Sequence, residues 1–401
     1  MKPHRSLEIT PRGAVAGWPR PTLGDLTTLC SFDGPCLSLY LPGHRPGTHS
    51  ANSVGRLRTQ LAATEVELAA GGMLPTDIDA LLSPLHQLEH DPELLEGHRD
   101  ALVVFRSIET TQLFREPGLE LDQHFVSRHF HIAPVLAQLM ATPDFYLLQL
   151  SRKRVQLSKV DPEGHTEMVL PPEIVSDYEK FKNFDQPDHL LRARSGASGG
   201  HGSQSPVSFG TGSEKESESG HFHDFCRSID RGMHGLLAKH PLPLVIAGTK
   251  TEVAAYRAAS GYPRLVEGSV GGSPEGGNSL AEMVREGRQL VGQWISPELQ
   301  HVLQLYRELS GSSKAVEELH AIVRAAALGL VEYLAFSAGT QANGNYDSLT
   351  ERRMLGGEFV ARDVDLVNAA MADTLRHRGK VMLLPEAGLT GSATVVAILR
   401  Y

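Results

Sequence analysis

Hydrophobic and polar positions follow two periods in the middle of the chain. Residues 145–150 (FYLLQL) are mostly apolar and residues 155–160 alternate strictly, so together they predict a β-hairpin. A second apolar run, residues 244–247, predicts a buried strand. Apolar residues recur every three or four positions at Phe222, Phe225, Ile229, Met233 and Leu236. This spacing predicts an amphipathic helix, and another helix is expected at 251–259. Alternating strands and helices indicate α/β layers.

Both ends of the chain carry the same patterns in shorter runs. Near the start, strands are predicted at residues 36–42, 101–105 and 123–127, and helices at 54–68 and from Pro75 onward, where Thr76 and Asp79 have capping-box spacing. Further along, helices are predicted at 279–304, 315–328 and 363–378, and strands at 333–336, 380–384 and 394–399. We therefore expect an α/β protein with a mixed N-terminal domain (1–137), a middle domain (138–310) and a C-terminal α/β sandwich (311–401).

Length and composition agree with several domains. The 401 residues exceed what one hydrophobic core usually serves, and 41% hydrophobic with 21% charged residues is typical of globular proteins. No uncharged apolar stretch of about 18 residues is present, and the first residues lack the apolar core of a secretory signal. Three cysteines cannot form a disulfide framework. These features predict a cytoplasmic protein with no membrane contact.

Charge and motifs exclude several function classes. The net charge of −9 gives no global basic field, so any contact with RNA must be local. Nineteen histidines are spread along the chain, and the pairs His129 with His131 and His221 with His223 lack a third metal ligand nearby. The sequence has no GxxxxGK[ST], GxGxxG, HExxH or CxxC motif. No metal and no cofactor are predicted, and an enzyme built on the histidines is disfavoured.

The most informative segment is residues 195–205, SGASGGHGSQS, in a Gly/Ser-rich loop predicted to span 195–220. Glycines allow a backbone to approach a ligand where a Cβ would clash. Besides serines, its functional side chains are His201 and Gln204. Glutamine is no general base, but its amide both donates and accepts hydrogen bonds and can orient water at an ester. The alternative is a flexible surface segment. Residues 196–200 also match GxSxG, yet they lack the buried strand and following helix of a hydrolase elbow.

Four further motifs, in their order, resemble a known family. They are CLSLYLPGHRPG, HFHIAPVLAQLMATPDFYLLQLSRKRVQL, YEKFKNFDQPDHLL and HGLLAKHPLPLVIAGTKTEVAAYR, and the C-terminal segment beginning DVDLVNAAMADTLRHRGK continues the match. The chain resembles the bacterial relatives of archaeo-eukaryotic peptide chain release factor subunit one, a clade that is also similar to Pelota and to eukaryotic peptidyl-tRNA hydrolases.

The resemblance implies a ribonuclease-H-like middle domain and a C-terminal domain like kink-turn-binding ribosomal proteins. It also implies a Gly-Gly-Gln tip that helps water attack the peptidyl-tRNA ester. Here Gly199-Gly200 is followed by His201, whereas Gly202-Ser203-Gln204 is similar to the tip of the peptidyl-tRNA hydrolase branch. The resemblance thus assigns catalysis to Gly202, Ser203 and Gln204. It assigns RNA binding to Gly199, Gly200, His201, Arg192 and Arg194, although the two arginines equally fit a solvated helix end.

Two functions follow as expectations. The first is a ribosome-associated release-factor-like protein that hydrolyses the peptidyl-tRNA ester in ribosome rescue or quality control. Its partners would be the ribosome and peptidyl-tRNA, with a translational GTPase as a further candidate. The second is a non-catalytic factor that occupies the ribosomal A site in stress or hibernation. The missing Gly-Gly-Gln and the acidic residues Glu214, Glu216 and Glu218, which RNA would repel, favour this alternative.

Overall fold

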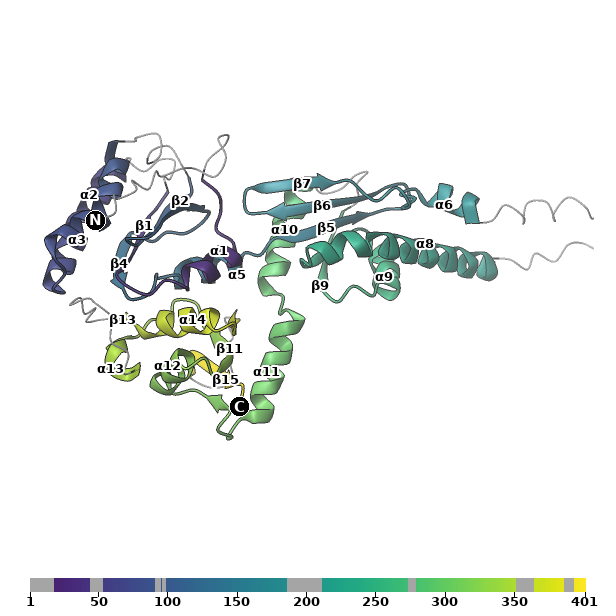
Figure 1. Cartoon of the computed structure of the whole chain (residues 1–401). Helices are drawn as coiled ribbons and strands as arrows, with labels where there is room; N and C mark the ends of the chain where they lie inside the picture. Colours follow the sequence, from purple (N-terminus) through teal and green to yellow (C-terminus); the bar gives the residue numbers. More distant parts are fainter. Residues whose placement is uncertain are drawn as a thin grey trace, which may run out of the picture. The chain divides into compact units, whose positions relative to one another are not determined.

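The chain divides into two compact units in a computed structural model (Figure 1). The structure describes residues 18–43, 53–90, 95, 99–185, 211–272, 279–350, 364–385 and 393–401. Unit 1 combines residues 1–141 with 298–401, and unit 2 comprises residues 142–297. Unit 2 is therefore inserted in sequence between the two parts of unit 1. The predicted three-domain division stays a prediction.

Unit 2 is built on a five-stranded mixed sheet. Its strands are β5 (Phe145–Leu150), β6 (Val155–Asp161), β7 (Gly164–Met168), β8 (Leu244–Ala247) and β9 (Leu265–Val270). The order is β7-β6-β5-β8-β9, with antiparallel pairing in the first three strands and parallel pairing from β5 through β8 to β9. The antiparallel hairpin and parallel crossovers have the ribonuclease-H-like order that the resemblance implies.

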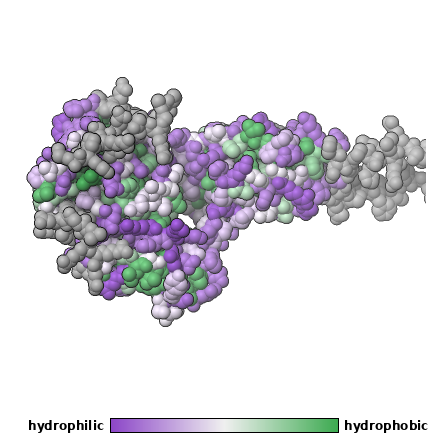
Figure 2. Space-filling view, in the orientation of Figure 1, coloured by the Kyte–Doolittle hydropathy of each residue, from purple (hydrophilic) through white to green (hydrophobic). Residues whose placement is uncertain are grey.

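Helices cover both faces of this sheet. The helices are α6 (Tyr178–Asp185), α8 (Thr211–Lys239), α9 (Lys250–Ala259) and α10 (Leu280–Gln293). Because side chains alternate along a strand, Tyr146, Leu148 and Leu150 of β5 pack with α8 and α9. Phe145 and Leu147 face the other way and pack with α10. The side of this unit seen in Figure 2 is mainly hydrophilic, as expected for helices whose apolar stripes are buried.

The N-terminal part of unit 1 holds an antiparallel sheet of order β3-β2-β1-β4. Its elements are α1 (Leu23–Leu29), β1 (Cys36–Leu41), α2 (Ser53–Ala70), α3 (Pro75–His86), β2 (Ala101–Arg106), β3 (Thr111–Glu116), β4 (Gln123–Ser127) and α5 (Ala133–Ala141). Central strand β1 is buried on both faces, since Leu37, Leu39 and Leu41 pack with α2 and α3. Cys36 and Tyr40 face the opposite side.

The C-terminal part of unit 1 holds a four-stranded sheet of order β10-β15-β11-β14. Its elements are α11 (Pro297–Leu309), β10 (Ala315–Val316), α12 (Leu319–Ala327), β11 (Val331–Phe336), β12 (Asn343–Gly344), α13 (Tyr346–Thr350), β13 (Val364–Asp365), α14 (Leu366–Arg376), β14 (Lys380–Leu383) and β15 (Val395–Leu399). Strand β11 pairs parallel with β14 and antiparallel with β15. Helices α12 and α14 pack on this sheet, so the C-terminal part is an α/β sandwich.

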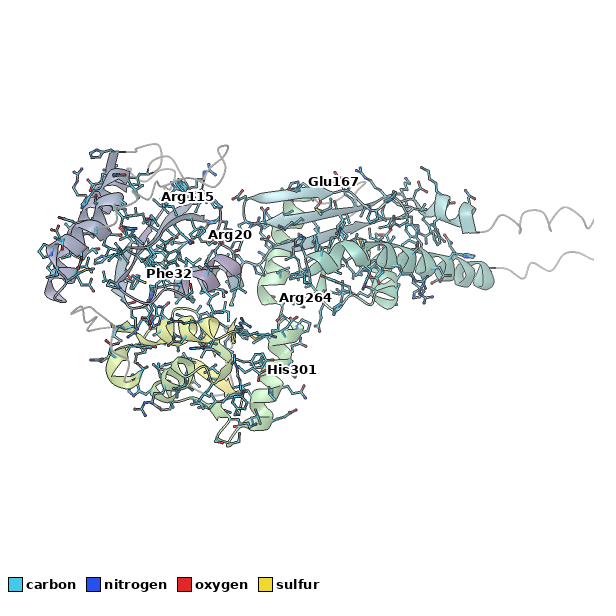
Figure 3. The ribbon with its side chains drawn as sticks, viewed as in Figure 1. Arg20, Phe32, Arg115, Glu167, Arg264 and His301 are labelled. Atoms are coloured by element: carbon cyan, nitrogen blue, oxygen red, sulfur yellow. The ribbon has the colours of Figure 1, made fainter. Side chains whose placement is uncertain are left out.

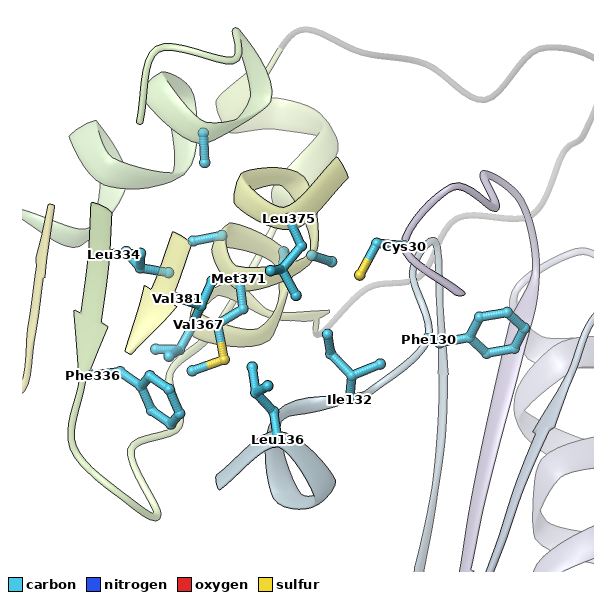
Figure 4. Packing of buried hydrophobic residues seen from close by; sticks show 14 of the residues in the cluster. Cys30, Phe130, Ile132, Leu136, Leu334, Phe336, Val367, Met371, Leu375 and Val381 are labelled. Carbon is cyan, nitrogen blue, oxygen red and sulfur yellow. The ribbon is translucent and has the colours of Figure 1, made fainter. Parts of the chain in front are cut away.

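One hydrophobic cluster spans both parts of unit 1. Phe130, Ile132 and Leu136 of the N-terminal part belong to the same cluster as Val367 and Met371 of α14 (Figure 4). All five side chains are essentially fully buried. The two parts therefore share a core although unit 2 separates them in the sequence. The α/β class and the several predicted sheets are confirmed.

Some predicted element boundaries are wrong. Helix α3 begins at Pro75, and its N-cap is Leu74, which makes no side-chain capping bond, so Thr76 and Asp79 form no capping box. The start of α3 is instead favoured by Pro75 at the first helical position, where a missing amide hydrogen costs nothing. The run 279–304 is two helices, α10 and α11, with Trp294 as the C-cap of the first. Residues 315–328 contain strand β10 before helix α12, and strands β3, β7 and β9 are additional.

Helix α8 also differs from the predicted loop 195–220, because it begins at Thr211. Its first turns contain the sequence EKESE, and glutamate and lysine are strong helix formers. The helix thus extends towards the glycine-rich tract, of which residues 186–210 lie outside the described structure.

The histidine pairs fall in structural settings. His131 is buried and stacks on Phe125 with 3.6 Å between ring centroids, and burial lowers the pKa of His131 to about 3, so its ring is neutral. His129 Nε2 lies 3.5 Å from Asp373 Oδ1. His221 and His223 lie on α8, where this spacing turns the rings to different sides. Within the described residues, no group of three metal-binding side chains forms, and no helix has the length and apolar character needed to cross a membrane.

Candidate functional site

The predicted site residues all lie outside the described part of the chain. These are Arg192, Arg194, Gly199, Gly200, His201, Gly202, Ser203 and Gln204. The structure does describe the elements on both sides of this tract, namely α6 before it and α8 after it (Figure 1). The candidate site is therefore built from the two helices that hold the ends of residues 186–210.

Helix α6 is tied to the turn between β5 and β6. The Tyr178 amide donates to the carbonyl oxygen of Arg152 at 2.8 Å, which fixes the first residue of the helix. The Lys180 amide donates to Asp177 Oδ1 at 3.0 Å, so Asp177 satisfies one of the free amides at the helix start. In the turn itself, the Ser151 hydroxyl accepts from the Arg154 amide at 3.0 Å. The rigid sheet thus sets where α6 begins.

An aromatic and charged cluster joins α6 to α8. We call it the stem cluster, and it consists of Arg152, Tyr178, Glu218, Phe222 and Phe225. The Arg152 guanidinium carbon lies 5.5 Å from the Tyr178 ring centroid and 5.4 Å from that of Phe222. The Tyr178 ring meets the rings of Phe222 and Phe225 at centroid distances of 5.3 and 5.5 Å. A tilted contact of 5.4 Å between Phe181 and Phe225 extends the cluster along α6.

Hydrogen bonds add direction to this packing. Arg152 Nη1 donates to the carboxylate of Glu218, and the Tyr178 hydroxyl donates to the Glu218 carbonyl oxygen at 3.3 Å. The hydrogen bond to Glu218 raises the pKa of Arg152, and the same bond lowers the pKa of the Glu218 carboxyl. Both groups are therefore charged at neutral pH, and burial raises the pKa of Tyr178, which stays neutral. One of the three acidic residues predicted to repel RNA is thus paired with an arginine.

The stem cluster can position but not react. It contains no nucleophile, and its polar groups are engaged with one another, so its chemistry is to fix the separation of α6 and α8. Arginine suits this role because its flat guanidinium stacks on aromatic faces while it donates to a carboxylate. Arg154 lies in the same turn, and its Nη2 is 3.7 Å from Glu167 Oε1 of β7 (Glu167 is labelled in Figure 3). Its side chain is more exposed than that of Arg152.

Replacing Arg152 by alanine is expected to lower the free energy of unfolding of unit 2 by about 1 kcal/mol, through the lost ring contacts and the half-exposed ion pair. Trp294 reports on unit 2 in a Trp18→Phe background, and urea unfolding followed by its fluorescence gives the value. Arg154→Ala is the matched control, with a change within about 0.5 kcal/mol. Equal losses in the two variants would contradict the special role of Arg152.

Sequence reasoning missed the stem cluster. Arg152 lies in the motif SRKRVQL and Tyr178 in YEKFKNFD. Phe222 and Phe225 belong to the amphipathic run, and Glu218 lies in the acidic stretch just before it. Periodicity assigned Phe222 and Phe225 to a buried helix face, which the structure confirms. The pattern could not reveal that a turn residue 66 positions before Glu218 reaches the same place.

One family model matches the part of the chain that contains this site. Residues 144–329 match the model of the bacterial archaeo-eukaryotic release factor family 3. This part of the chain, just under half of it, is release-factor-like, which confirms the resemblance that the motifs predict. No curated protein matches the sequence significantly.

Solved structures show weaker likenesses. An archaeal Pelota, from a model of ribosome-bound archaeal Pelota and ABCE1, is 11% identical with a TM-score of 0.36, over 96% of this chain and 95% of that one. Dom34 of S. cerevisiae, described as a translation termination-like factor, is 12% identical with a TM-score of 0.35, over 73% of each chain. The archaeal termination factor aRF1 is 12% identical with a TM-score of 0.23, over 94% and 96%. Sequence identities and TM-scores this low do not support transferring a function from these proteins to this chain.

Proposed function

We propose that this release-factor-like protein binds the ribosome and hydrolyses the peptidyl-tRNA ester in ribosome rescue or quality control. The observation that carries the proposal is the family match over residues 144–329, which includes the sheet, the stem cluster and the glycine-rich tract. The sheet and the stem cluster give that tract a rigid base in α6 and α8. The ribosome, peptidyl-tRNA and a translational GTPase are the proposed partners.

The proposed chemistry needs little from the protein itself. Gln204 supplies an amide that orients the attacking water, and the small residues Gly202 and Ser203 let the backbone approach the ester. A backbone amide beside the developing oxyanion would stabilise negative charge in the transition state. Gly199, Gly200, His201, Arg192 and Arg194 are proposed to contact RNA, with the arginines facing phosphates.

A second candidate function is non-catalytic occupation of the A site. It is supported by the sequence Gly199-Gly200-His201, in which histidine stands where a Gly-Gly-Gln tip would have glutamine. In that case the tract would fill the site without positioning water. The two candidates share ribosome binding and differ only in ester hydrolysis.

One experiment separates them. Purified ribosomes stalled with a radiolabelled peptidyl-tRNA are incubated with the full chain, with and without GTP and a cell extract that supplies translational GTPases. Pelleting through sucrose measures binding, and peptide released from tRNA measures hydrolysis. Binding with release supports the first function, and binding without release under every condition supports the second. A chain that does not pellet with ribosomes would refute both.

A further inference from the structure

Two helices of the C-terminal part of unit 1 end at the same edge of the sheet in the same way. Helix α12 leads into β11 and α14 leads into β14, and these strands are parallel neighbours. Each helix ends in a Schellman motif, in which two successive amides return to the last-turn carbonyls. The bonds are Gly329 to Ala326 at 2.9 Å, Leu330 to Ala325 at 2.9 Å, Arg378 to Leu375 at 3.0 Å and Gly379 to Thr374 at 2.7 Å.

The residue that takes the left-handed conformation differs between the two motifs. In α12 it is Gly329, with φ of 73°, as the motif favours. In α14 it is Arg378, with φ of 62°, and it is the one non-glycine residue with positive φ among those described. A long side chain is unfavourable in this conformation. A cation does complement the end of a helix, but Arg376 in the last turn already supplies one.

Other cations converge on the same edge. Arg400 links the two helix ends, because its amide donates to the Leu330 carbonyl at 2.9 Å and its Nη2 donates to the His377 carbonyl at 2.7 Å. On β14, Lys380 is the register partner of Tyr333, and its Nζ lies 5.6 Å from that ring. The exposed Lys314 directly precedes β10, and its carbonyl accepts from the Leu399 amide at 2.8 Å.

An exposed aromatic side chain lies beside these charges. Tyr401 follows Arg400 directly and is 84% exposed. Glu332, an exposed acidic residue, lies in β11 next to Tyr333. We call Lys314, Arg378, Lys380, Arg400 and Tyr401 the basic edge. It is a local concentration of positive charge in a chain whose net charge is −9.

We propose that the basic edge binds the sugar-phosphate backbone of RNA, with Tyr401 available to stack on a base. Separate exposed cations fit a repeating phosphate backbone, and an aromatic ring between or beside them is typical of sites for unpaired bases. An arginine kept in a conformation that favours glycine is explained if its charge is needed at this position. The proposal rests on the proposed ribosome association for the source of the RNA, and it does not depend on ester hydrolysis.

The test uses the full chain and a fluorescent RNA hairpin with a single-stranded loop, without ribosomes. Fluorescence anisotropy gives Kd over a series of KCl concentrations. In the triple variant Lys314→Gln, Arg378→Gly and Lys380→Gln, Kd is expected to rise at least about tenfold, and the salt slope to fall by about 2 to 3. A control triple variant, Arg231→Gln, Lys239→Gln and Arg285→Gln, loses as much charge from exposed positions of unit 2. Its Kd is expected to change less than about twofold.

Arg378→Gly alone separates binding from folding. Because glycine suits φ of 62°, the Tm is expected to stay the same or to rise by roughly 1–4 °C, while the salt slope falls by about 1. A lower Tm with unchanged Kd would make Arg378 a structural cap and overturn the proposal. So would wild-type affinity in the triple variant.

Two further outcomes are decisive. An acidic peptide that binds the wild type more tightly than the hairpin, and loses affinity in the triple variant, would assign the edge to a protein and refute RNA. If the chain fails to pellet with ribosomes but its hairpin binding depends on the basic edge, the proposed function fails and this inference stands.

Discussion

Replacing Gln204 by alanine is expected to lower peptide release from stalled ribosomes by about 100-fold to 1,000-fold, with ribosome binding unchanged. The size follows from the proposed role, because losing the side chain that positions the attacking water costs about 100-fold or more in rate. A side chain that orients water contributes little to affinity for the ribosome, so rate and binding should separate. Single-turnover release measures the rate, and pelleting of the same samples measures binding.

Ser205→Ala is the matched control, because it truncates the neighbouring residue of the same tract and leaves Gln204 in place. Its release rate is expected to stay within about threefold of the wild type. If Gln204→Ala releases peptide as fast as the wild type, Gly202-Ser203-Gln204 is not the catalytic tip. A parallel His201→Ala variant then tests the alternative tip, Gly199-Gly200-His201.

The central elements of unit 2 could be predicted because their sequences carry strong local patterns. Strands β5 and β8 are apolar runs that are buried on both faces, and β6 alternates as a strand beside them should. The apolar stripe from Phe222 to Met233 marks the buried face of α8. In each case the buried residues lie within one short stretch of sequence, so the local pattern predicts the element.

Edge strands could not be predicted in the same way. The sequence of β7, GHTEM, is largely exposed and forms a strand because its backbone pairs with β6. Strand β9 contains the polar run Glu267-Gly268-Ser269, and a Cβ at Gly268 would lie 2.4 Å from Leu290 Cδ2 of α10. Such strands depend on neighbours far along the chain rather than on their own hydrophobicity.

Long-range contacts set the same limit at the candidate site and in unit 1. The proposed tip rests on glycines and a resemblance in the sequence, whereas the stem cluster depends on side chains brought together by the sheet. The shared core of unit 1 joins residues that precede unit 2 in the sequence to residues that follow it. The hydrophobic period of a helix predicts that one face is buried, but it does not predict which other helix that face will contact.

Asn368 of α14 is a buried polar residue at the junction between the two parts of unit 1. Its Oδ1 accepts from the amides of Ile132 and Ala133 at 2.8 and 3.1 Å, and its Nδ2 donates to the Phe130 carbonyl at 3.1 Å. Asn368 is 1% exposed. One side chain therefore caps the start of α5 and holds the segment before it against the C-terminal part.

Asn368→Ala is expected to lower the free energy of unfolding of unit 1 by about 3–5 kcal/mol, because two buried backbone groups and one half-buried amide lose their partner and each costs about 1–3 kcal/mol. Trp18 packs in unit 1, so its fluorescence in a Trp294→Phe background follows urea unfolding of this unit. The exposed Asn343 provides the control, since Asn343→Ala should change stability by less than about 0.5 kcal/mol. A loss below about 1 kcal/mol in Asn368→Ala would mean that the apolar core and the ion pairs of Arg128 with Asp347 and of Arg376 with Asp33 join the two parts without this side chain.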